Sequence, residues 1–251
     1  MARLVWITGA STGIGHATAL AYARDGWTVA ASARDATALA TMAAGSAGRI
    51  HAFPLDVTDE PATLATHAAI EQALGQIDLA IFSAGTHLPV RLEPFETRAF
   101  RKLVEVNLMG VVYCLGAVLP AMTRRRGGQI AIVSSVAGYF GMPTAAAYSA
   151  TKSALISLAQ SLKFDCDRYG IALSVINPGF VRTPLTDKNE FPMPFLISAE
   201  EAAKRIVDGL AAKRFEITFP RRFALILKLI RLLPYGLFFP LVARGTRIEK
   251  P

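Results

Sequence analysis

The stretch Thr8-Gly9-Ala10-Ser11-Thr12-Gly13-Ile14-Gly15 decides the fold because of what stands on either side of it. The apolar run 4–8 before it predicts a buried strand, and the segment after it predicts a helix that ends near residue 25. Glycines let the backbone turn tightly and approach a pyrophosphate, and the following helix points its free N–H groups at that anion. A dinucleotide site requires this order of strand, glycine turn and helix. The alternative is a tight turn that holds no ligand.

The rest of the chain alternates apolar runs with longer helical segments. Further strands are predicted at 28–32, 50–55, 79–83, 129–134, 172–176 and 216–219, and helices at 106–123, 148–168 and 199–212. The strands are apolar on both faces, which is typical of a parallel sheet covered by helices on both sides. Right-handed crossovers then give an α/β doubly wound parallel sheet, the Rossmann fold. A length of 251 residues suits one such domain.

Composition excludes several classes of protein. Hydrophobic residues make up 52% and charged residues 18%, which supports a large core and excludes disorder. Cys114 and Cys166 form no disulfide framework, and the four histidines are scattered, so we expect no metal site. The triplet 124–126 (Arg-Arg-Arg) predicts a solvated helix end, and we expect no nucleic-acid partner. A strand begins at once, without a signal peptide, so we expect a cytoplasmic location.

Tyr148 and Lys152 form the candidate acid–base centre. Four residues apart on a predicted helix, they share one face. A free tyrosine titrates near pH ~10, so we expect the Lys152 ammonium and a positively charged nicotinamide to lower the pKa of Tyr148. Tyr148 can then give a proton to a carbonyl oxygen or take one from an alcohol. Ser134 and Ser135 stand at the carboxyl end of a predicted strand, where a hydroxyl can donate to a substrate oxygen.

The glycine spacing, with Tyr-x3-Lys downstream, resembles the short-chain dehydrogenase/reductase family over roughly residues 3–220. The family's usual distance of thirteen residues to Tyr148 selects Ser135 over Ser134. The resemblance implies that Lys152 also hydrogen-bonds the nicotinamide ribose. It further implies that Asn107 holds a water in a proton relay from the lysine; the alternative is an ordinary satisfied polar residue.

The resemblance also implies the cofactor contacts. Asp56, beside Val57, matches the residue that meets the adenine, and 83–85 (Ser-Ala-Gly) stands where the family usually has Asn-Ala-Gly. After the sixth strand, a backbone group at Val181 and the Thr183 hydroxyl hold the carboxamide. The full set of predicted cofactor residues is Gly9, Ser11, Thr12, Gly13, Ile14, Gly15, Arg34, Asp56, Val57, Ser83, Ala84, Gly85, Tyr148, Lys152, Pro178, Gly179, Val181 and Thr183.

The end of the second strand indicates which nicotinamide cofactor binds. Enzymes that use NAD usually carry a carboxylate there for the ribose 2′-hydroxyl, and this position aligns with Ala33. Arg34 follows, and a guanidinium can pair with a 2′-phosphate through two parallel hydrogen bonds. We therefore expect NADP(H). Asp35 could partly offset Arg34 or simply cap the next helix.

The segment 184–197 is the predicted substrate lid. Its apolar residues are Leu185, Phe191, Pro192, Met193, Pro194, Phe195 and Leu196, and its charged ones are Asp187, Lys188 and Glu190. This lining suits an apolar or amphipathic substrate. The alternative is a lid that packs on its own core.

The chain continues past the predicted catalytic domain, 1–220, as an extension at 221–251. The extension carries seven basic residues and one acid, which gives it six of the eight net positive charges of the chain. Its first part predicts an amphipathic helix on which Arg221, Lys228, Arg231 and Tyr235 share a narrow face. Basic residues and prolines interrupt any apolar run long enough to cross a bilayer. The segment 221–243 could instead lie on a membrane surface, cap the substrate pocket or pack against a partner subunit.

These patterns together predict an NADP(H)-dependent carbonyl reductase or alcohol dehydrogenase that acts on a hydrophobic ketone or alcohol, such as a lipid or a steroid. The alternative is a membrane-docked NADP-binding sensor or scaffold without turnover. The resemblance implies a homodimer or homotetramer. The expected location is the cytoplasm, with or without peripheral contact at the inner face of a membrane.

Overall fold

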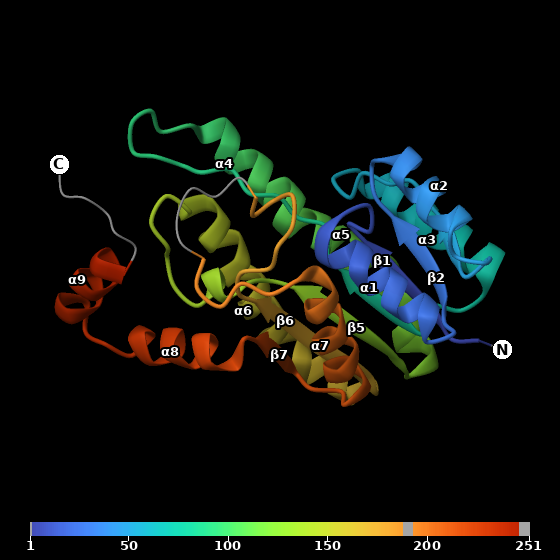
Figure 1. The fold of residues 1–251 in the computed structure, drawn as a ribbon. Helices are drawn as coiled ribbons and strands as arrows, with labels where there is room; N and C mark the ends of the chain where they lie inside the picture. Colours follow the sequence, from blue (N-terminus) through green and yellow to red (C-terminus); the bar gives the residue numbers. More distant parts are fainter. Residues whose placement is uncertain (1, 188–192, 246–251) are drawn as a thin grey trace.

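The seven predicted strands all form and pair in parallel in the order β3-β2-β1-β4-β5-β6-β7 (Figure 1). The computed structural model describes residues 2–187 and 193–245. The strands are β1 Leu4–Thr8, β2 Thr28–Ser32, β3 Ile50–Ala52, β4 Leu79–Phe82, β5 Gly128–Val133, β6 Ile171–Pro178 and β7 Glu216–Phe219. The strand order reverses direction between β1 and β4, which opens a crevice at their carboxyl ends. The expected doubly wound α/β sheet is confirmed.

Some of the helices cover the two faces of this sheet, and others lie beyond them. The helices are α1 Gly13–Arg24, α2 Ala36–Ala44, α3 Glu60–Leu74, α4 Thr97–Val104, α5 Gly110–Arg125, α6 Ala146–Arg168, α7 Ala199–Ala211, α8 Arg221–Arg231 and α9 Tyr235–Gly245. One core joins the sheet to α3, α5 and α6, and a second core joins the other face to α1, α2 and α7. The crevice at the carboxyl ends of the strands therefore lies on a scaffold that is buried on both sides.

Strand β1 shows why apolar and polar residues do not alternate along the strands. Leu4 and Trp6 pack into one core, whereas Val5 and Ile7 pack into the other, and all four are at most 2% exposed. The Trp6 indole N–H donates to the Ser32 hydroxyl at 3.0 Å, so its polar atom is satisfied inside the core.

Several elements differ from the expected bounds. The helix predicted at 106–123 begins at Thr97 and passes through a π-helical turn, Glu105–Met109, before α5. Among the described residues, this helix is the one that is long and apolar enough to cross a membrane. It packs against α3 and α6 in the core of the fold, which accounts for its apolar composition.

The C-terminal extension forms two helices that lie beyond one end of the sheet (Figure 1). Ala224 and Leu227 of α8 are buried against Val136 and Tyr139, which belong to the segment after β5. Lys228 forms an ion pair with Glu216 of β7. The extension is thus attached to the sheet, and the division at residue 220 stays a prediction.

Candidate active site

The glycine turn after β1 is built for close backbone approach. Gly9 and Gly13 have φ values of +69° and +59°, which side chains disfavour. A Cβ on Gly15 would lie 2.3 Å from the Gly9 carbonyl oxygen. Thr12, the N-cap of α1, makes no side-chain capping bond, and the first turn of α1 carries no acid. The first N–H groups of α1 therefore remain available for a diphosphate, so these residues fit a dinucleotide.

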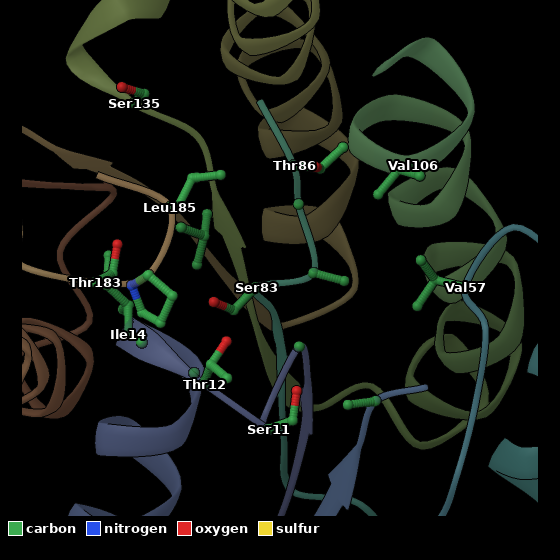
Figure 2. A pocket seen from close by; sticks show the side chains of 18 of the residues that line it. Ser11, Thr12, Ile14, Val57, Ser83, Thr86, Val106, Ser135, Thr183 and Leu185 are labelled. Atoms are coloured by element: carbon green, nitrogen blue, oxygen red, sulfur yellow. The ribbon is translucent and has the colours of Figure 1, made fainter. Parts of the chain in front are cut away.

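A cavity of about 400 Å³ starts at this turn and runs along the carboxyl ends of the strands. All eighteen predicted cofactor residues line it, and so does Ser135. Figure 2 shows Ser11 and Thr12 at one end, Ser135 at the other, and Ser83, Thr183 and Leu185 between them. The structure thus brings the predicted residues to one site, while the role of each toward a cofactor stays a prediction.

Sequence reasoning missed part of the cavity wall. The additional lining residues are Ala33, Asp35, Leu55, Thr86, Lys102, Val106, Val133, Ser134, Pro184, Leu185 and Thr186. Ser134 is the alternative to Ser135 as a substrate donor, and residues 184–186 belong to the predicted lid. Most of the additional residues adjoin a motif residue, so neighbourhood in the chain could have suggested them. Lys102 and Val106 come from α4 and the π-helical turn, and no local sequence pattern predicts that they line the cavity.

Ser135 and Ser134 have different partners. The Ser134 hydroxyl is buried and donates to the Lys152 carbonyl oxygen at 2.8 Å. Ser135 is partly exposed, its hydroxyl accepts from the Ala137 N–H at 3.1 Å, and it donates to the Pro178 carbonyl oxygen over a long 3.4 Å. Because this donated bond is long, the Ser135 hydroxyl can turn to a ligand more readily than that of Ser134, which supports the choice made from the spacing.

Tyr148 and Lys152 lie one turn apart on α6, as expected. The Lys152 Nζ is 5.6 Å from the centre of the Tyr148 ring and donates to the Val133 carbonyl oxygen at 2.9 Å. Burial raises the pKa of Tyr148, and its hydrogen bond with Ser135 offsets part of that rise. Burial also lowers the pKa of Lys152 to about 8.

The expected downward shift of the Tyr148 pKa by Lys152 is therefore wrong for the protein by itself. Desolvation of the phenolate is the largest effect on this pKa, and the Lys152 ammonium is turned toward a backbone carbonyl.

Asn107 occupies the π-helical turn between α4 and α5 and is fully buried. Its amide accepts from the Thr86 N–H at 2.8 Å and donates to the Thr86 carbonyl oxygen at 2.9 Å. A weaker bond reaches the Thr151 hydroxyl at 3.3 Å. The side chain thus fixes the loop after β4, and its part in a proton relay stays a prediction.

His87 belongs to the same loop and contacts Tyr148, the predicted acid–base residue. Its ring packs edge-on against Tyr148, with 4.9 Å between the ring centres. Burial lowers the pKa of His87, so the imidazole is neutral at pH 7. The sequence offered no signal for this contact, because a scattered histidine is usually a packing or surface residue.

Arg34 and Asp35, which follow β2, differ in their contacts. Asp35 caps α2, and its carboxylate accepts from the Ala38 N–H at 2.9 Å. Arg34 is exposed at the cavity rim and makes no ion pair within the described part of the chain. Of the two roles considered for Asp35, the structure shows the helix cap.

The loop after β6 is held in a defined shape. The Thr186 hydroxyl donates to the Val181 carbonyl oxygen at 2.7 Å and accepts from the Thr183 N–H at 3.0 Å. The Gly179 N–H donates to the Phe219 carbonyl oxygen at 2.7 Å. These bonds position the predicted carboxamide contacts at the cavity wall.

The predicted lid is described in part. Lys188, Glu190, Phe191 and Pro192 lie outside the described residues. Leu185 lines the cavity, as a substrate contact would, whereas Phe195 packs on Phe223 of α8 with 5.9 Å between the ring centres. Leu185 therefore supports the lid as a substrate lining, and Phe195 supports a lid that packs on the protein.

Comparisons with known proteins agree with this geometry. Residues 3–192 match the profile of the short chain dehydrogenase family. An uncharacterized oxidoreductase of Myxococcus xanthus is 35% identical over 94% of both chains. The 3-oxoacyl-[acyl-carrier-protein] reductase FabG of Thermotoga maritima is 33% identical over 74% of this chain and 77% of its own.

Solved structures give the same result. A short-chain dehydrogenase of Streptomyces avermitilis superposes with a TM-score of 0.81 at 25% identity, over 98% of this chain and 96% of its own. ElxO with NADP bound superposes with a TM-score of 0.79 at 25% identity, over 87% of this chain and 98% of its own. An actinorhodin polyketide ketoreductase with NADPH superposes with a TM-score of 0.78 at 25% identity, over 86% of this chain and 94% of its own.

The chain belongs to the short-chain dehydrogenase/reductase family. It is an oxidoreductase that acts on CH–OH groups with a nicotinamide cofactor.

Proposed function

We propose that the protein is an NADP(H)-dependent carbonyl reductase, or an alcohol dehydrogenase in the reverse direction, for a hydrophobic ketone or alcohol. The observation that carries this proposal is the layout of the cavity. Arg34, which can pair with a 2′-phosphate, lines one part of the rim, and Ser135, Tyr148 and Lys152 line the catalytic end of the same cavity.

NADPH, when bound, supplies the hydride that is added to the carbonyl carbon. The Ser135 hydroxyl donates to the carbonyl oxygen and holds it beside the Tyr148 hydroxyl. Tyr148 then delivers the proton to that oxygen as an alkoxide develops there.

The raised pKa of Tyr148 suits the direction of reduction, because the phenol stays protonated at neutral pH and remains a proton donor. Lys152 keeps a charge below about pH 8 and favours the phenolate that forms after the transfer. In the reverse direction, the positive charge of an oxidised nicotinamide would add to this effect.

The surroundings of the catalytic end support a hydrophobic substrate. Val106 and Leu185 contribute apolar side chains to the cavity. Two of the related proteins are named as reductases of a 3-oxoacyl chain and of a polyketide, which are ketones on extended carbon chains.

The proposal is tested by following NADPH and NADH oxidation in parallel across a panel of long-chain keto lipids, steroids and small ketones. We expect turnover of an apolar ketone and a preference for NADPH. Tight NADPH binding without turnover of any ketone would instead favour a sensor or scaffold.

We also propose a cytoplasmic location, since Cys114 and Cys166 are both free and buried. Assembly into a homodimer or homotetramer remains a prediction from the family.

A further inference from the structure

We propose that α8 and α9 dock the enzyme on the surface of an anionic lipid bilayer. Six exposed apolar side chains form the contact, and we call them the docking face: Leu225, Ile226, Leu229, Leu232, Leu237 and Phe239.

Helix α8 presents two apolar faces, and only one of them packs on the protein. Ala224 and Leu227 are 1% and 6% exposed against the segment after β5. Leu225 and Leu229, one turn apart, are 59% and 57% exposed, and Leu232 is 78% exposed. The attachment through the buried face fixes the direction of the other face, so the exposure is a property of the fold.

Helix α9 continues the same arrangement after Pro234. Phe238 is buried against Phe140, with 5.1 Å between the ring centres, and this contact anchors the helix. Its neighbours Leu237 and Phe239 are each 62% exposed. Tyr235 stacks on Phe239 at 5.4 Å and is itself exposed, and an amphipathic ring of this kind suits the headgroup region.

The charge of the extension favours lipid over a second copy of this chain. Residues 221–245 include five basic residues and no acid. Lys228 is paired with Glu216, which turns it toward the protein. Arg221, Arg222 and Arg231 are exposed and form no ion pair with any described residue. Two docking faces would bring these arginines together, whereas anionic headgroups would neutralise them.

The helices are too short to cross the bilayer. Helices α8 and α9 have 11 residues each, about half of what a membrane span needs. Apolar side chains on one side of short helices, flanked by arginines, instead suit a helix pair lying in the interface plane.

Flotation of the full-length protein with vesicles tests the proposal. Vesicles of phosphatidylcholine alone are compared with vesicles that also contain phosphatidylserine. The double variant Leu225→Ser/Leu229→Ser is compared with Leu64→Ser, a 47% exposed leucine on α3. We expect wild type and Leu64→Ser to float with the anionic vesicles, and the double variant to bind them about tenfold more weakly.

The charge contribution has its own pair of variants. Arg222→Gln and Arg231→Gln should each weaken binding to anionic vesicles about fivefold, the factor that about 1 kcal/mol represents, and added salt should reduce the difference. Arg24→Gln, on α1, should leave binding unchanged. Circular dichroism of each variant confirms that it is folded.

Two outcomes would overturn the proposal. One is a wild-type protein that stays with the unbound fraction, or a double variant that floats like the wild type. The other is self-association, in which the docking faces of two copies of the chain cover each other. Light scattering would then give a lower molecular mass for Leu225→Ser/Leu229→Ser than for the wild type, and the wild type would bind no vesicles.

Discussion

Replacing Arg34 by alanine should change the choice of cofactor without changing the catalytic chemistry. Arg34 is exposed at the cavity rim, and Asp35, the carboxylate next to it, is occupied as the cap of α2. The guanidinium is therefore free to make two parallel charge-assisted hydrogen bonds with a 2′-phosphate. NADH has no such phosphate, so the interaction belongs to NADPH alone.

The size of the effect follows from these contacts. Two charge-assisted hydrogen bonds at an exposed site contribute together about 2–3 kcal/mol, less than twice the usual value of one such bond, because water screens them. This corresponds to a loss of roughly 30- to 150-fold in kcat/KM for NADPH. The value for NADH should stay within about twofold of the wild type.

Steady-state kinetics at saturating ketone measures both values. Arg24→Ala, an exposed arginine on α1, is the matched control and should change neither. Ala33→Asp/Arg34→Ala should go further and raise kcat/KM for NADH, because the new carboxylate can accept from the ribose 2′-hydroxyl. An equal loss with both cofactors, or no loss with either, would refute the assignment of Arg34 to the 2′-phosphate.

Three further outcomes are expected. The kcat/KM for carbonyl reduction should be flat below about pH 8 and fall above it. The reason is that Lys152, with a pKa of about 8, loses its charge there, while Tyr148 stays protonated. A kcat/KM that rises through pH 8 would contradict this. Gly209→Ala should lower the free energy of unfolding in urea by about 1–3 kcal/mol, since its Cβ would lie 2.7 Å from Ile217 Cγ1. Gly116→Ala should raise it by about 0.5–1 kcal/mol, because its Cβ would meet no atom of another segment within 4 Å. His87→Ala should lower kcat about three- to tenfold through the lost ring contact with Tyr148, while His87→Phe keeps most of the rate and neither changes NADPH affinity; equal rates in all three proteins would remove the positioning role.

The site could be predicted from sequence wherever the reasoning was local. An apolar run, a glycine turn and the start of a helix fix β1 and α1 together, and a parallel sheet gathers the carboxyl ends of its strands at one edge. Residues as distant in sequence as Gly13, Asp56 and Thr183 were therefore bound to meet at one cavity.

What escaped prediction depends on contacts between distant segments. The amide of Asn107 could not be assigned to the backbone of Thr86 before the packing of the π-helical turn beside the loop after β4 was known. The pKa of Tyr148 depends on burial, which a spacing of four residues does not report.

The extension illustrates the same limit. Periodicity predicted a mostly apolar helix with Lys228 and Tyr235 on one basic face, but α8 ends at Arg231 and Tyr235 begins the separate helix α9. Periodicity also could not show that Lys228 turns inward to Glu216, which lies on a separate strand. This ion pair, with the buried Leu227, decides which apolar face of α8 remains exposed.

The most direct test of the account is single-turnover reduction of an accepted ketone by wild type and Tyr148→Phe, with NADPH affinity measured in parallel by fluorescence. We predict that the variant binds NADPH within about threefold of the wild type and loses at least about a thousandfold in the rate of reduction, because the proton donor is gone while the ring remains. A variant that reduces the ketone at the wild-type rate would contradict the assignment of Tyr148 as the proton donor and, with it, the proposed reaction.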